Sequence, residues 1–377
     1  MKNDASRDFR KTMNPTSTTP RGARADRPGA RVSACVVVKD EATVLRSALD
    51  GVRDHVDEII VVDGGSSDDS VAIAESCGAQ VFVDLGDVSA ARNRAIREAK
   101  GDYCLMIDGD EIVDVETWPF LSEFIREARH PRGRIQQISL TVDGLASVWL
   151  TRLCANDGRF HYEGSVHEQL VGPGSIGKTG LSVRHSGYAP ETLARKGTSD
   201  RNLRLLRSEL AKWPTDPYLN YQLGKTLRVA GRVAESLAPF AIAAARVPPG
   251  ASYASSLACD FGYALKDAGQ PLEALALVRV FLREFADYTD LWFLEGLCHL
   301  AVGNAEEMVF AFEKCIALGE APDYATVQGV GTFRASYNLG IYHELCGNNG
   351  RARELYLQAL DSNPSFAPAS ARLAGLR

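Results

Sequence analysis

The sequence predicts two domains of different class, an α/β domain with a parallel sheet followed by an all-α domain of helical hairpins. Two observations carry this prediction. Apolar and helical stretches alternate over residues 32–110, and pairs of glycines seven residues apart recur after residue 217. A chain of 377 residues is also too long for one compact core, so two domains are expected from length. We place the domains at residues 31–212 and 213–377.

The α/β prediction rests on runs of apolar, often β-branched residues separated by helical stretches. The expected strands are residues 32–38, 58–62, 80–83 and 103–107, and the expected helices between them lie near 42–52, 68–77 and 88–99. This order predicts a parallel sheet whose ligand crevice lies at the carboxyl ends of its strands. After residue 118 the pattern is weaker. Residues 135–143 and 147–153 are expected as strands, and 191–210 as a helix.

Composition and charge exclude several classes of protein. Hydrophobic residues make up 45% and charged residues 24%, which is typical of a globular protein. The formal net charge of −6 disfavours nucleic-acid binding through a basic face. No stretch approaches ~18 apolar residues, so no transmembrane segment is expected. None of the eight cysteines forms a Cys-x-x-Cys motif, which predicts reduced cysteines in a cytoplasmic protein.

Residues 1–30 differ from the rest of the chain. They carry seven Lys or Arg residues against three Asp residues and are rich in Ser, Thr and Pro. They lack the apolar core of a secretory signal. We expect a disordered basic tail, and peripheral contact with an anionic membrane surface is the alternative.

Three of the expected strands end in polar residues at the edge where a ligand should bind. The polar stretches are Lys39-Asp40-Glu41, residues 63–68 and Asp108-Gly109-Asp110-Glu111. In an extended segment residues two apart point the same way, so Asp108 and Asp110 are expected to aim at one point. Convergent carboxylates repel each other unless a cation lies between them, and oxygen ligands suit Mg²⁺ or Mn²⁺. A solvated acidic turn is the alternative.

Taken together, these stretches resemble glycosyltransferase family 2, which has a GT-A (Rossmann-like) fold. The likeness is carried by residues 36–41, 56–68, 89–93 and 101–111, and it extends to 167–168 and 185–188. The resemblance implies a hexosyltransferase that uses a nucleotide sugar, with uridine as the expected nucleoside, and inverts the anomeric centre. It implies Mn²⁺ or Mg²⁺ as cofactor. Members of similar architecture carry carboxy-terminal tetratricopeptide repeats, and some glycosylate peptides, so a peptide, protein or glycan acceptor is expected.

The resemblance also implies which residues contact the nucleotide sugar. Asp63 matches the acid that hydrogen-bonds the base, and Arg92 lies where a guanidinium can meet the diphosphate or the sugar. Asp108 would face the ribose and the metal, and Asp110 would bind the metal directly. The remaining expected contacts are Val38, Lys39, Glu41, Ser66 and His185. Arg92 on an exposed helix surface is the alternative reading of that residue.

The catalytic base is less clearly marked. Inverting transfer needs a carboxylate or an imidazole within hydrogen-bond reach of the acceptor nucleophile. Glu168 is the first candidate because it follows the metal motif where the acceptor side should lie. His167, His185 and Glu111 are rivals, and the two histidines could instead bind the metal or the diphosphate.

The second domain contains an internal repeat. Four glycines are each followed seven residues later by another, in the pairs Gly224/Gly231, Gly262/Gly269, Gly296/Gly303 and Gly340/Gly347. Their spacing is close to the ~34-residue period of tetratricopeptide repeats, with insertions. Such repeats are helical hairpins that bury their faces against neighbours. They could dock an extended acceptor, and the end of the chain could pair with a second copy.

Three alternative functions agree less well with the sequence. A tetratricopeptide interaction scaffold with a degenerate nucleotide-sugar domain is the main alternative, and the intact set of Asp63, Arg92, Asp108 and Asp110 argues against it. A nucleotidyltransferase would need a glycine-rich phosphate loop near the first strand, which is absent from the sequence. A glycoside hydrolase needs carboxyl groups on opposite sides of a bond, which neighbouring aspartates on one face do not provide.

Overall fold

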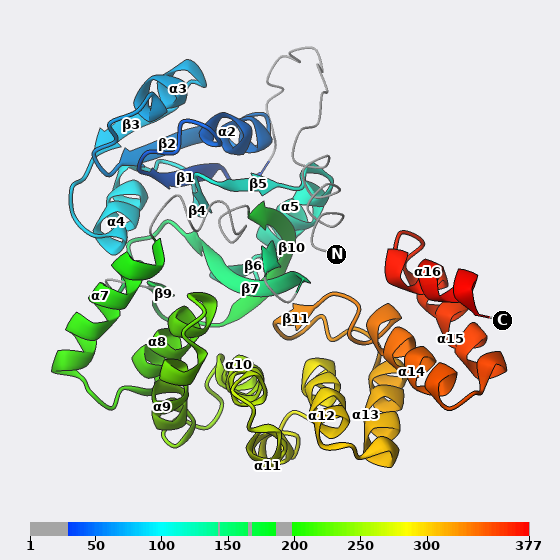
Figure 1. Ribbon diagram of the computed structural model, residues 1–377. Helices are drawn as coiled ribbons and strands as arrows, with labels where there is room; N and C mark the ends of the chain where they lie inside the picture. Colours follow the sequence, from blue (N-terminus) through cyan, green and yellow to red (C-terminus); the bar gives the residue numbers. More distant parts are fainter. Residues whose placement is uncertain (1–28, 142–143, 165–167, 186–197, 377) are drawn as a thin grey trace. The chain divides into compact units, whose positions relative to one another are not determined.

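The computed structural model describes residues 29–141, 144–164, 168–185 and 198–376, and the chain divides into two compact units (Figure 1). The division falls between Lys196 and Gly197. Helix α7 (Thr198–Lys212) packs against α8 (Pro217–Val229) and belongs to the helical unit. The boundary expected from the sequence assigns this helix to the first domain instead. The boundary at 212/213 is therefore corrected to a position before α7.

The first unit contains a mixed sheet in the strand order β3-β2-β1-β4-β7-β6-β10-β5. The strands are β1 (Val32–Val38), β2 (Glu58–Asp63), β3 (Gln80–Val83), β4 (Tyr103–Asp108), β5 (Glu111–Val113), β6 (Arg132–Thr141), β7 (Gly144–Ala155) and β10 (Ile176–His185). The first four are parallel, as predicted. Strand β7 runs antiparallel to both β4 and β6, and the residues of β4 that it pairs with are Tyr103, Cys104 and Leu105.

Helices and a small second sheet complete this unit. They are α2 (Leu45–Arg53), α3 (Ser70–Ser76), α4 (Val88–Glu98), the 3₁₀ turn η1 (Val115–Thr117), α5 (Trp118–Glu127) and the hairpin of β8 (His161–Glu163) with β9 (Gln169–Val171). The predicted strands and helices at residues 32–107 are confirmed, with ends shifted by up to three residues. The strands predicted at 135–143 and 147–153 correspond to β6 and β7.

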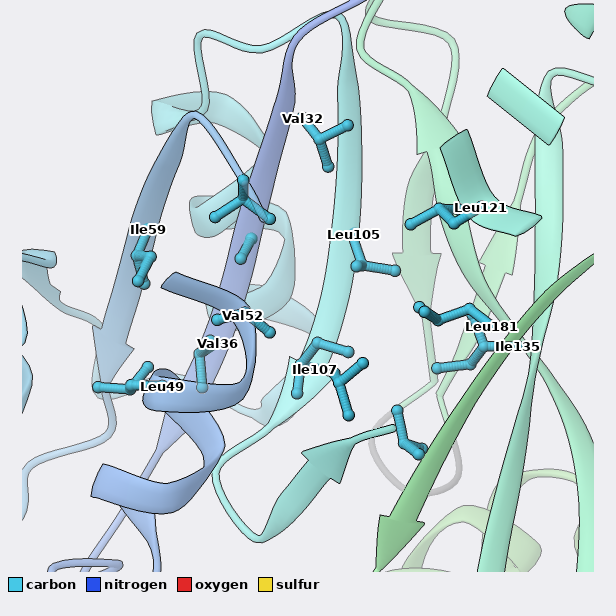
Figure 2. Packing of buried hydrophobic residues seen from close by; sticks show 14 of the residues in the cluster. Val32, Val36, Leu49, Val52, Ile59, Leu105, Ile107, Leu121, Ile135 and Leu181 are labelled. Carbon is cyan, nitrogen blue, oxygen red and sulfur yellow. The ribbon is translucent and has the colours of Figure 1, made fainter. Parts of the chain in front are cut away.

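Both faces of the parallel part of the sheet are buried, which explains its near-continuous apolar strands. Alternate residues of β1 point to opposite faces: Val36 lies in one apolar cluster and Cys35 in another. Figure 2 shows the first cluster, where Leu49 and Val52 of α2 lie near Val36 and Ile107. This packing fixes the carboxyl ends of β1, β2 and β4 relative to one another.

The second unit is a series of helical hairpins followed by a final helix (Figure 1). After α7 come α8/α9 (Val233–Ala244), α10 (Ala254–Asp267)/α11 (Pro271–Phe281), α12 (Thr289–Val302)/α13 (Ala305–Leu318) and α14 (Phe333–Leu345)/α15 (Asn349–Ser362), then α16 (Ala367–Gly375). The short strand β11 (Thr326–Val327) lies between α13 and α14. Consecutive hairpins pack against each other. The predicted all-α domain of stacked hairpins is confirmed.

The glycine pairs have distinct structural reasons. A Cβ at Gly296 would lie 2.7 Å from the ring of Phe312, so the first glycine of the pair lets two helices approach closely. Gly303 has φ +76° at the end of α12, a left-handed conformation that glycine adopts at low cost. The other three pairs follow the same scheme.

Two further sequence expectations concern the amino-terminal tail and membrane-spanning segments. The predicted basic tail falls almost wholly in residues 1–28, outside the described residues. Within the described part of the chain, every helix is too short or too polar to cross a membrane.

Candidate active site

The loops after β1 and β2 are joined by polar contacts. Asp40 has φ +55° and its Oδ1 accepts hydrogen bonds from the N–H (2.7 Å) and the hydroxyl (3.0 Å) of Ser67. The Asp40 N–H in turn donates to Ser66 Oγ at 2.9 Å. These bonds make the two loops one wall of the predicted ligand crevice.

Asp63 is buried and shapes the turn that follows β2. Its carboxylate accepts hydrogen bonds from the N–H of Gly65 (3.0 Å), the N–H of Ser66 (3.0 Å) and the Ser66 hydroxyl (2.5 Å). The predicted base contact at Asp63 would be additional to this turn-forming role.

Val38, Lys39 and Glu41 lie at the same edge of the sheet. Val38 is buried and is paired with Asp63 across β1 and β2, whereas Lys39 is exposed. Glu41 is half-buried, and its Cγ would lie 3.4 Å from a Cβ at Gly109. The ends of β1, β2 and β4 therefore meet, as the sequence predicts.

Asp108 is held by two arginines. Nη2 of Arg92 lies 2.7 Å from Oδ1, while Arg152 of β7 places Nη1 3.1 Å from Oδ1 and Nη2 2.6 Å from Oδ2. The Asp108 side chain is 27% exposed, but both arginine side chains are below 10%. Burial and the nearby carboxylates raise the pKa of Asp108, although Arg92 opposes the shift.

Arg92 also contacts the first candidate for the catalytic base. Its Nη2 lies 2.8 Å from Oε1 of Glu168, so one guanidinium bridges Glu168 and Asp108. The Arg92 guanidinium lies 5.0 Å from the centre of the Tyr162 ring. Burial lowers the pKa of Arg92, but Asp108 and Glu168 outweigh it and raise the pKa overall. The alternative of an exposed helix-surface arginine is wrong, because Arg92 is 4% exposed.

Helix α4 positions the hairpin that carries Glu168. The Asn93 side chain accepts from the Tyr162 N–H at 2.7 Å and donates to the Tyr162 carbonyl at 2.9 Å. One helix thus supplies both Arg92 and the anchor for β8. His167, a rival candidate for the base, lies outside the described residues.

Glu111 is a supporting residue by its geometry. It is fully buried, accepts hydrogen bonds from Gln137 (2.5 Å) and from the Asp108 N–H (2.9 Å), and lies 3.9 Å from Arg152. Burial, followed by the charge of Asp108, raises its pKa to about 8. A fully buried carboxyl offers no surface to an acceptor, so this geometry argues against Glu111 as the base.

Asp110 and His185 form a separate pair. Oδ1 of Asp110 lies 3.3 Å from Nε2 of His185, and His185 Nδ1 lies 3.4 Å from the Ser139 hydroxyl. Burial lowers the pKa of His185, but the hydrogen bond and charge of Asp110 outweigh it and raise the pKa to about 9. His185 is brought here because β10 pairs with β5 opposite Glu111.

The expectation that the Asp108–Asp110 segment is extended is wrong. Strand β4 ends at Asp108, and residues 109–110 form a turn before β5. The alternation of side chains therefore stops at Asp108. The two carboxylates contact different partners, guanidinium groups for Asp108 and an imidazole for Asp110.

Sequence reasoning missed Arg152, Asn93 and Gln137 as parts of this site. Arg152 lies within a stretch read only as a strand, and a charged residue in an apolar strand was the available signal. Asn93 lies in one of the stretches that resemble the family, but the resemblance assigns it no role. Gln137 carried no signal, because its partner Glu111 is 26 residues away.

Comparisons with known proteins agree with the fold. The model of the family "Glycosyl transferase family 2" matches residues 33–153, and that of "Tetratricopeptide repeat" matches residues 289–320. An uncharacterized glycosyltransferase of Rickettsia bellii is 35% identical over 227 residues, covering 48% of this chain and 74% of the relative. The chain therefore belongs to glycosyltransferase family 2, and the predicted family and GT-A-like fold are confirmed.

Other relatives match over shorter shares. A TPR repeat-containing protein of Synechococcus elongatus is 33% identical over 212 residues, which is 52% of each chain. The chain thus spans about half the length of this and several other curated relatives. Among solved structures, glucosyl-3-phosphoglycerate synthase of Mycobacterium tuberculosis, in complex with Mn²⁺ and uridine diphosphate, matches with a TM-score of 0.27. It is 23% identical and covers 29% of this chain and 44% of that one.

Proposed function

We propose that the chain is a metal-dependent, inverting glycosyltransferase that moves a sugar from a uridine diphosphate sugar to a peptide, protein or glycan acceptor. The observation that carries the proposal is the network at the strand ends of the family 2 domain. There Arg92 bridges Asp108 and Glu168, and Asp110 is paired with His185. Arg92 is a candidate diphosphate-binding cation, Glu168 is a candidate base, and the Asp110–His185 pair is a candidate metal site that follows the same strand end.

Asp110 and His185 fit a divalent cation. Carboxylate and imidazole are ligands that Mn²⁺ accepts, and Mg²⁺ is commonly held by one or two carboxylates together with substrate phosphates. Among the described residues, no cluster of three or more His, Cys, Asp or Glu side chains could hold a metal. Diphosphate oxygens and water would therefore complete the coordination. A bound ion supplies positive charge opposite the leaving diphosphate.

The chain's own residues perform the remaining steps. Arg92 binds the diphosphate through its planar guanidinium, which matches phosphate oxygens in pairs. Glu168, 13% exposed and ion-paired with Arg92, accepts the proton of the acceptor nucleophile at its carboxylate. The loops around Asp63 and Val38 flank the base of the nucleotide.

A panel of nucleotide sugars tests this proposal. We expect release of nucleoside diphosphate from a uridine diphosphate sugar with Mn²⁺ or Mg²⁺, and loss of release in chelator-treated buffer. Release that is equal with and without metal would contradict the metal assignment. Absence of release from every nucleotide sugar, with the chain folded, would favour the interaction scaffold.

We further propose that the helical unit binds the acceptor. Tetratricopeptide hairpins stack into extended surfaces that suit extended partners. A chain ending before Gly197 should retain release of nucleoside diphosphate to water and lose transfer to the acceptor. Equal loss of both activities would assign the repeats a structural role instead.

A further inference from the structure

Arg152 has no role in the proposal above, although it makes the most extensive contact with Asp108. It reaches across from β7 and forms two bonds, at 3.1 and 2.6 Å, to the two oxygens of the carboxylate. Paired parallel N–H···O bonds of this kind fix the plane of a carboxylate as well as its position. With Arg92 also on Oδ1, both oxygens of Asp108 have guanidinium partners.

Asp108 has cationic partners without a metal ion. The guanidinium groups of Arg92 and Arg152 both lie within hydrogen-bond distance of its carboxylate. Two neighbouring carboxylates need a cation between them when none is near. Here the protein supplies that charge to Asp108 through Arg152.

We propose that Arg152 is a positioning residue that divides the work of the two aspartates. By holding Asp108, it keeps this carboxylate away from the metal, and the ion is left to Asp110 and His185. Asp108, held by the two arginines, then presents the exposed part of its side chain to the nucleotide sugar. This inference rests on the proposed function, because it assigns roles within the same site.

The first test removes Arg152. In Arg152→Met, Asp108 loses its main partner and the site gains a net negative charge. We expect Mn²⁺ alone, titrated while free Mn²⁺ is followed by electron paramagnetic resonance, to bind about tenfold more tightly than to the wild type, while kcat falls about 100-fold. Arg152→Lys keeps the charge without the paired bonds and should fall between the two. A merely structural role for Arg152 would not tighten metal binding.

The second test removes the charge of Asp108, the partner of Arg152. Asp108→Asn should leave Mn²⁺ affinity within about twofold of the wild type, and Asp108→Asn combined with Arg152→Met should return the affinity to that level. Arg159→Met, which removes an exposed arginine paired with Asp157, is the control for loss of one positive charge. If Arg152→Met is unfolded, the Asp108→Asn titration still decides.

Two results would overturn the inference. One is unchanged or weaker Mn²⁺ binding in folded Arg152→Met, and the other is a more than tenfold loss of Mn²⁺ affinity in Asp108→Asn. Failure of the proposed function would give a different experimental result. In that case the wild type releases no nucleoside diphosphate from any nucleotide sugar, whereas the metal titrations still report on Arg152.

Discussion

The strand ends of the first unit and the helix contacts of the second unit bury different kinds of group. At the strand ends of the first unit the buried residues are charged, and Arg92, Arg152 and Asp110 are each less than a tenth exposed. In the helical unit Gly296 lies against the ring of Phe312. Burying charge is costly even when the charges are paired, whereas closely packed apolar surface stabilises a fold. Substitutions in the first group should therefore remove activity with little loss of stability, and substitutions in the second should do the reverse.

The largest expected effect is in the first unit. Asp110→Asn keeps the shape of the side chain but removes the charge paired with His185. We expect the rate of sugar transfer to fall about 10³-fold, because the metal loses its carboxylate ligand. Steady-state release of nucleoside diphosphate measures the rate, and thermal unfolding should shift by only a few degrees.

A matched control for this variant is Asp114→Asn. Asp114 directly follows β5, its side chain is about one third exposed, and it pairs with Arg184 at 3.6 Å, outside the network. It should retain most of the wild-type rate. Wild-type turnover by Asp110→Asn in chelator-treated buffer would remove the basis of the metal proposal.

Asp290 of α12 tests whether the comparison holds without exception, because it is a buried ionisable residue in the helical unit. Its carboxylate accepts from the Thr326 hydroxyl (2.6 Å) and the Val327 N–H (2.8 Å), yet burial outweighs these bonds and raises its pKa to about 7. In the unfolded chain this group loses its proton near pH 4, but the folded chain keeps it until about pH 7. Stability should therefore fall as pH rises from 4 to 7, by up to about 4 kcal/mol, and change no further above that range.

Asp290→Asn should flatten this dependence, since asparagine resembles the protonated carboxyl. Urea denaturation at intervals between pH 4 and pH 8, followed by circular dichroism, gives the slope. Asp287→Asn, an exposed neighbour, should keep the wild-type slope. A slope that is the same in Asp290→Asn and wild type would show that other groups control the pH dependence.

The next largest expected effect is a difference in stability between substitutions of the two glycines of one repeat, Gly296 and Gly303. In Gly296→Ala the new Cβ would lie 2.7 Å from the buried Phe312 ring, and overpacking of this kind costs about 1–3 kcal/mol. In Gly303→Ala there is open space, but φ +76° makes the substitution cost about 1 kcal/mol. The free energy of unfolding in urea should fall more for Gly296→Ala. The opposite order would mean that α12 and α13 can move apart at little cost.

The sequence predicted best what depends on neighbouring residues. The parallel strands, the family and the hairpin repeats are confirmed, because an apolar run or a glycine pair determines its structure locally. The contacts of Asp108 could not be predicted in the same way. Arg152 comes from 44 residues further along the chain, and only the antiparallel insertion of β7 next to β4 brings it to Asp108.

The local backbone conformation after β4 was also predicted wrongly from the sequence. We treated residues 108–110 as extended, but β4 ends at Asp108 and a turn follows. The reason is that β5 leaves β4 to pair with β10, so the chain must change direction between them. That change brings Asp110 to His185. The two aspartates therefore gained separate partners that their spacing alone did not indicate.

The smallest expected effect lies at the centre of the site. Gly109 has no left-handed conformation, and a Cβ there would lie 3.1 Å from Val38 Cγ1 and 3.4 Å from Glu41 Cγ. These contacts require shifts of only a few tenths of an ångström. Gly109→Ala should keep the transfer rate within about threefold and the free energy of unfolding within about 1 kcal/mol of the wild type. A loss as large as that of Asp110→Asn would mean that the turn between β4 and β5 tolerates no movement. The charged site would then depend on tight packing as much as the helical repeats do.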